Sequence, residues 1–198
     1  MQLIGERGAA LAWRRVAVTI ALAFLLGWPA YSDTISDPAV NFEFEANGTD
    51  PRVCHLTALI MNVPRSPEAA KLSLTYAESK SQNVAFVGFA LDVGDTQFAN
   101  GLPAGITPAK LSSAEISAPE FTTTGRLFGG PIPDGGIMMS TQDPETARLL
   151  MGIFFEGSFR VTFARQGSAA NRTYVVRNAP DPNVVQQFLR CAKNSLPR

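Results

Sequence analysis

Residues 52–63, RVCHLTALIMNV, alternate between two kinds of side chain. One set is entirely apolar and the other is mixed: Cys54, Leu56, Ala58 and Ile60 against Val53, His55, Thr57, Leu59 and Met61. A period of two predicts a β-strand with one buried face. Because neighbouring strand residues point to opposite faces, we expect Cys54 to face the core and His55 to face away from it. The contiguity of a thiol with the only histidine is therefore poor evidence for a catalytic pair.

Similar patterns on both sides of this segment predict further strands. They fall at residues 40–46, 71–79, 83–93, 110–118, 120–128 and 135–141, and in a hairpin of residues 157–165 and 172–178. Residues 94–108 are rich in turn formers and predict a loop. The glycines of the segment LFGGPIPDGG are likewise expected in turns: Gly129, Gly130, Gly135 and Gly136.

Two helices have well-marked starts. Asp143 precedes Pro144 and Glu145, and Asp181 precedes Pro182, an arrangement typical of an N-cap followed by the first helical turn. Together these elements predict a mainly β (α+β) fold: an antiparallel β-sandwich-like single domain with one internal helix and a short C-terminal helix.

The N-terminus predicts export. Arg7, Arg14 and Arg15 precede an apolar run at residues 16–28, which is shorter than the roughly 20 residues of a membrane span. Small residues follow at the positions that signal peptidase requires. We therefore expect residues 1–32 to be a signal peptide, residues 33–198 to be one β-rich domain without a membrane span, and the protein to be periplasmic or secreted.

Export also determines what the two cysteines can do. Cys54 and Cys191 both follow the predicted cleavage site, and disulfides persist in an oxidising compartment. Two cysteines allow a single intramolecular pairing, so a Cys54–Cys191 disulfide is expected. Such a bond would remove the thiolate that a nucleophile or a metal ligand needs.

Charge is unevenly distributed along residues 33–198. They carry 14 basic and 16 acidic residues, which makes nucleic acid an unlikely partner, yet residues 148–198 hold 8 basic residues and only 2 acidic ones. The C-terminal hairpin therefore offers a possible interaction surface for a protein or envelope partner: Arg160, Arg165, Arg172 and Arg177. Alternatively, these cations neutralise acidic elements from the N-terminal part of the domain.

The search for catalytic motifs favours a non-enzymatic protein. No serine occupies a G-x-S-x-G turn, and the chain has no cluster of metal-ligating residues and no cofactor motif. Asp92 and Asp95 are interpreted as turn residues rather than as a cation site. The alternative is a glycosidase-like hydrolase with carboxylates in a cleft between the sheet and the helix after Asp143, for which Glu43, Glu45 and Glu115 are the candidates.

The C-terminal third, LLMGIFFEGSFRVTFARQG…RTYVVRNAPDPNVVQQFLRCAKNSL, resembles the ending of the invasion-associated locus B family of exported proteobacterial proteins. Cys54 and Leu56 are similar to a C-x-L motif near the start of the mature family members. A second cysteine pair of the family has no counterpart here. The resemblance implies a β-rich, periplasmic or envelope-associated, non-enzymatic protein that acts as a binding or interaction module, and it supplies no catalytic residues.

Overall fold

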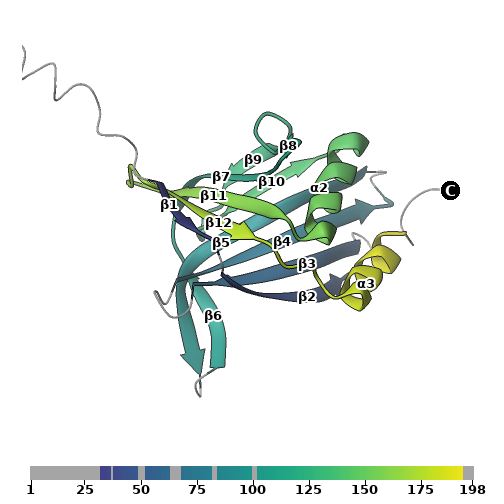
Figure 1. Cartoon of the computed structure of the whole chain (residues 1–198). Coiled ribbons are helices and arrows are strands. Elements are labelled where there is room, and N and C mark those ends of the chain that lie inside the picture. Colours follow the sequence, from purple (N-terminus) through teal and green to yellow (C-terminus); the bar gives the residue numbers. More distant parts are fainter. Residues whose placement is uncertain are drawn as a thin grey trace, which may run out of the picture. The chain divides into compact units, whose positions relative to one another are not determined.

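Two β-sheets and two helices account for the regular structure of the described residues (Figure 1). The computed structural model describes residues 32–36, 38–48, 52–62, 68–81, 84–99 and 102–193. The predicted signal peptide, residues 1–32, lies outside these ranges except for Ser32, and from Ser32 onward the chain forms one unit.

The larger sheet has the strand order β2-β3-β4-β5-β10-β9, and β6 pairs with the distal half of β5. Its strands are β2 (Ala39–Asn47), β3 (Arg52–Met61), β4 (Glu68–Ser79), β5 (Val84–Ala99), β6 (Leu102–Pro108), β9 (Phe128–Pro131) and β10 (Ile137–Thr141). All of its pairings are antiparallel. The alternation in residues 52–63 is realised in β3, where Cys54 is fully buried and His55 lies on the opposite, partly exposed face.

The smaller sheet has the order β1-β12-β11-β7-β8. Its strands are β1 (Ser32–Ile35), β7 (Leu111–Ala118), β8 (Phe121–Thr122), β11 (Phe159–Arg165) and β12 (Asn171–Val176). The predicted hairpin is confirmed as β11 and β12, in antiparallel register from the pair Phe159 and Val176 to the pair Ala164 and Asn171. The short strand β1 was not predicted, and it pairs with β12 in parallel.

Both helices begin where the Asp-Pro pairs predicted. In α2 (Pro144–Glu156), the Asp143 carboxylate accepts a hydrogen bond of 2.8 Å from the backbone N–H of Thr146. Hydrogen bonding with the side chain of Thr146, followed by that with its backbone, lowers the pKa of Asp143. The helix ends at Gly157, whose φ of 63° is a left-handed conformation that glycine adopts without strain. The second helix is α3 (Pro182–Lys193).

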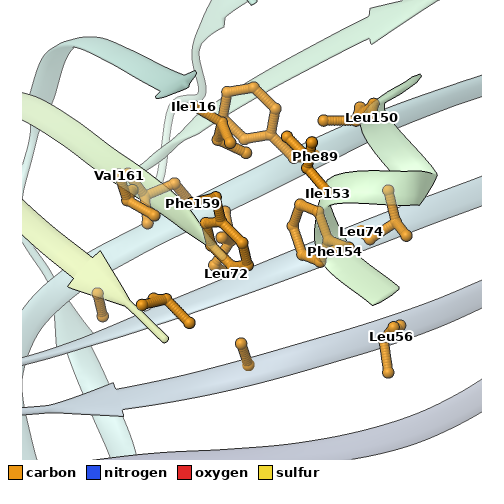
Figure 2. Packing of buried hydrophobic residues seen from close by; sticks show 14 of the residues in the cluster. Leu56, Leu72, Leu74, Phe89, Ile116, Leu150, Ile153, Phe154, Phe159 and Val161 are labelled. Carbon is orange, nitrogen blue, oxygen red and sulfur yellow. The ribbon is translucent and has the colours of Figure 1, made fainter. Parts of the chain in front are cut away.

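The core lies between the inner faces of the two sheets and extends under the helices. Figure 2 shows Phe154 of α2 beside Phe159 of β11, and their rings stack with centroids 5.0 Å apart. Leu72 and Leu74 of β4 are fully buried in the same cluster (Figure 2). In Figure 1, α2 lies on the same side of the larger sheet as the smaller sheet does, which leaves the other face of the larger sheet uncovered by these elements.

The predicted disulfide joins Cys54 of β3 to Cys191 of α3, with 6.1 Å between their Cα atoms. It fixes α3 on the inner face of the larger sheet, where the helix contacts β2 and β3. Phe188 of α3 is fully buried and meets Phe155 of α2 edge to face, with centroids 5.9 Å apart. The bond therefore connects the end of the described chain to one of its first strands.

Several predictions about turns and strands were wrong. Residues 94–108 are not a loop, because β5 continues to Ala99 and pairs with β6, with an irregularity between Gln97 and Phe98 that accommodates a change of register. Residues 120–128 are not one strand, because a turn containing Gly125, at a φ of 73°, separates β8 from β9. Turn-forming residue types do not show whether the backbone of a segment forms hydrogen bonds with a partner strand.

Gly129 and Gly130 lie within β9 rather than in a turn. At Gly129 a Cβ atom would collide with the backbone carbonyl of Met138 on β10, and the φ of 147° is one that other residues rarely adopt. The glycine therefore permits close approach of two strands.

The mainly β, antiparallel sandwich-like fold with an internal and a C-terminal helix is confirmed.

Candidate functional site

Two of the four arginines predicted to form an interaction surface are bound to a buried carboxylate. Glu68 at the start of β4 is only 3% exposed, and it forms salt bridges with Arg165 and Arg172 of the smaller sheet. The Arg172 guanidinium donates to it over 2.7 Å, and the Tyr174 hydroxyl donates to it over another 2.7 Å. This cluster joins the two sheets, so these two arginines are engaged in holding the fold together.

The pKa shifts of Arg172 and Tyr174 are those expected for two side chains that donate hydrogen bonds to Glu68. The hydrogen bond to Glu68 is the main factor that raises the pKa of Arg172. Burial, followed by the hydrogen bond to Glu68, raises the pKa of Tyr174 far above its ordinary value. Both partners thus remain protonated and donate to the Glu68 carboxylate.

The other two arginines lie together on the outer face of the smaller sheet. Arg160 of β11 and Arg177, which follows β12, line a cavity of about 400 Å³. Ser117 of β7 is directly opposite Arg160 in register, and Ser158 lies at the mouth of the same hairpin. Within the described ranges, neither arginine forms a salt bridge with a carboxylate. We call this feature the arginine cavity.

A second concave feature crosses the outer face of the larger sheet. A cavity of about 340 Å³ is lined there by residues of β2, β3, β4, β5 and β10. Hydroxyl groups form part of its floor, and those of Thr57 and Ser73 are hydrogen-bonded over 2.9 Å. An adjoining cavity of about 300 Å³ shares Thr57, Lys71 and Asp92 with the first. We call the two together the sheet groove.

His55 lies in the sheet groove with its Nδ1 atom 3.0 Å from the Thr75 hydroxyl oxygen. Sequence reasoning found no partner for this histidine, because the partner lies 20 residues away on the next strand. Burial lowers the pKa of His55, the Glu45 charge acts in the opposite direction, and Lys71 lowers it further. The imidazole is therefore neutral at pH 7.

An NMR titration of His55 is expected to give a pKa below the ordinary value of 6.5. Because the folded state then holds the proton less tightly than the unfolded state, the free energy of unfolding should decrease as the pH falls below about 6.5. The same titration of stability in His55→Gln should lack that contribution. A measured pKa at or above 6.5 would mean that the charge of Glu45 outweighs burial.

The candidate hydrolase carboxylates are not brought together. Glu43 and Glu45 lie on the exposed face of β2, whereas Glu115 of β7 belongs to the other sheet, where it accepts a hydrogen bond of 2.6 Å from Thr124. The predicted cleft beside α2 is occupied by apolar side chains of that helix, among them Leu150 and Phe154. Glu43, Glu45 and Glu115 therefore share no cleft with α2.

Asp92 and Asp95 are not turn residues, because both lie in β5. An odd spacing along a strand places them on opposite faces, so they do not form a common cation site. In the described part of the chain, no group of three or more His, Cys, Asp or Glu side chains is arranged to hold a metal ion. Among the same residues, no helix is both long and apolar enough to cross a membrane.

Glu68 and Asp92 are the important groups whose surroundings the sequence did not reveal. The spacing of Glu68 from Leu72 and Leu74 does place it on the inner face of β4, and an ionisable residue on an apolar face is a signal of a buried charge. Its partners lie 97 to 106 residues later in the chain. Asp92 falls within the strand predicted at residues 83–93, but the cavities that it lines depend on residues from neighbouring strands.

Comparison with known proteins found no family model that matches the chain, no matching curated protein and no matching solved structure.

Proposed function

We propose that this chain is an exported, periplasmic or envelope-associated protein that acts as a non-enzymatic binding module, and that the arginine cavity binds an anionic group of its partner. The arginine cavity carries this proposal, because it places two guanidinium groups and two serine hydroxyls around one concave space. Guanidinium groups form strong, often paired hydrogen bonds with phosphate and carboxylate oxygens.

The salt bridges of Glu68 leave Arg160 and Arg177 as the candidate anion-binding residues. Arg165 and Arg172 already hold a carboxylate of the same chain, and an external anion would have to compete with it. Arg160 and Arg177 have no such competitor among the described residues. The binding surface is therefore restricted to the end of the hairpin nearest Gly157 and the start of β11.

Export is supported by two observations. The N-terminal residues have the charge and length pattern of a signal peptide, and the Cys54–Cys191 disulfide is compatible with an oxidising compartment. The resemblance of the C-terminal third to the invasion-associated locus B family adds the expectation of an envelope location.

A hydrolase has less support. The outer face of the larger sheet carries Glu43 and Glu45 on β2 and Asp92 on β5, and β3 and β4 lie between these two strands. The candidate carboxylates Glu43, Glu45 and Glu115 share no cleft with α2, where the hydrolase site was predicted.

Reversing both charges of the arginine cavity, Arg160→Glu with Arg177→Glu, is expected to weaken binding to phosphatidylglycerol vesicles at least about tenfold, because each charge-assisted hydrogen bond contributes about 1.5 to 3 kcal/mol. Vesicle co-sedimentation of the purified, oxidised protein measures this. Phosphatidylcholine vesicles, which carry no net charge, should bind weakly to both proteins.

Arg148→Glu with Arg190→Glu is the matched control. These arginines are exposed on α2 and α3, and the double change alters the net charge by the same amount without affecting the cavity. The control should keep its binding. Equal loss in both double variants would mean that net charge alone drives association, and unchanged binding of the cavity variant would contradict the proposed site.

A further inference from the structure

The sheet groove has the opposite charge character to the arginine cavity and lies on the other sheet. Three carboxylates line it, Glu43 and Glu45 from β2 and Asp92 from β5, against a single cationic side chain, that of Lys71. Burial lowers the pKa of His55, which favours its neutral form. The groove is thus acidic overall.

One side of the groove is apolar. Phe86 and Ala90 of β5 and Met138 of β10 line it, and Met138 is 48% exposed. An aromatic ring and a thioether both interact favourably with an organic cation or with an aromatic group. Acidic and apolar linings therefore meet within one cavity of about 340 Å³, which is within the usual size range of small-molecule sites.

Asp92 connects the two parts of the groove, because it lines both cavities. Lys71 is directly opposite it in the β4–β5 register, but the described residues provide no salt bridge to its carboxylate. Burial raises the pKa of Asp92 and the Lys71 charge lowers it, with burial the larger of the two effects. A cation bound in the groove would add to the compensation that Lys71 provides.

The neighbouring turn leaves room for this carboxylate. At Gly136, between β9 and β10, a Cβ atom would collide with Oδ1 of Asp92, and the φ of 73° also favours glycine. The backbone of the turn thus lies against the Asp92 carboxylate and restricts its movement. Asp92 is held at the junction of the acidic and apolar linings.

From these features we infer that the sheet groove binds a small organic cation, an ammonium group attached to an apolar body, with the ammonium group at Asp92 and the apolar body against Ala90 and Met138, which are opposite each other in the β5–β10 register. The acidic lining favours a positively charged ligand, and the apolar lining favours an apolar group attached to that charge. This site is separate from the arginine cavity, so each can be tested without the other.

Calorimetric titration with three probes of similar shape tests the inference: phenethylamine, phenethyl alcohol and phenylacetate. The amine should bind at least about fivefold more tightly than the alcohol, because only the amine gains the attraction of the carboxylates. Phenylacetate should bind more weakly than either. Equal affinity for all three, or no binding of the amine at millimolar concentration, would overturn the inference.

Asp92→Asn should lower the affinity for phenethylamine to that for phenethyl alcohol. Asp95→Asn makes the same charge change on the same strand but on the opposite face, and should leave the affinity unchanged. Lys71→Gln removes the one competing cation and should raise the affinity for the amine about twofold or more. This gain cannot arise from misfolding. Identical affinities of the Asp92 and Asp95 variants would contradict the assignment.

Discussion

Replacing both cysteines, Cys54→Ala with Cys191→Ala, is expected to lower the free energy of unfolding by about 3 to 5 kcal/mol. The two residues are separated by 137 positions, so the disulfide restricts the unfolded chain over most of the domain. In the folded state the bond also retains α3, which buries only Phe188 and Ala192 deeply. Urea denaturation of the oxidised wild type and of the variant measures the difference.

Reduction of the wild-type protein provides the control. The reduced protein should unfold at nearly the same urea concentration as the alanine variant, because both lack the same crosslink. Single cysteine variants are unsuitable, since the remaining thiol can form intermolecular disulfides. A loss below about 1 kcal/mol in both proteins would contradict a major contribution of this bond to stability.

Removing both cationic partners of Glu68, Arg165→Gln with Arg172→Gln, is expected to cost about 3 kcal/mol of stability. The carboxylate is only 3% exposed, so the change removes two charge-assisted contacts from a poorly hydrated site and keeps the hydrogen bond from the Tyr174 hydroxyl. The arginines are about 40% exposed, and a glutamine in their place can be hydrated. The cost therefore arises chiefly at the Glu68 carboxylate, which loses both guanidinium groups.

Glu68→Gln in the same background separates charge from packing. The triple variant should recover part of the lost stability, because its buried group is neutral. Chemical denaturation of the wild type, the double variant and the triple variant measures how the effect of the Glu68 charge on stability depends on the two arginines. A triple variant less stable than the double variant would mean that the Glu68 carboxylate stabilises the fold without its arginines.

Local pattern was sufficient to predict most of the fold. In residues 52–63 the alternation places the Cys54 side chain in the core, and the Asp-Pro pairs mark the starts of both helices. These signals are local, since a strand face and a helix cap each depend on residues a few positions apart. The expectation of export and the presence of two cysteines were then sufficient to predict the disulfide.

The predictions that were wrong concern segments whose structure depends on pairing between strands. The glycines and prolines of residues 94–108 resemble a loop, yet the hydrogen bonds of β6 to β5 make this segment a hairpin. Gly129 forms part of a strand because its partner approaches too closely for any side chain. The parallel addition of β1 to β12 has no local signal at all.

Candidate sites were less predictable for the same reason. The charge of the hairpin was evident from composition, but the division of its arginines into two pairs depends on Glu68, which comes from the other sheet. The sheet groove assembles His55, Lys71 and Asp92 from three strands. The sequence shows which residue types are present, but only the register of the strands shows that these residues lie together.

The proposed function can be tested most directly by NMR, with glycerol phosphate titrated into the oxidised protein and the shifts of the backbone amides followed. The largest shifts should occur at the arginine cavity, at Ser117, Ser158, Arg160 and Arg177, and they should vanish in the variant with both cavity arginines reversed. Shifts of similar size around Arg148 and Arg190, or shifts that persist in the reversed variant, would contradict the proposal that this cavity is the anion-binding site.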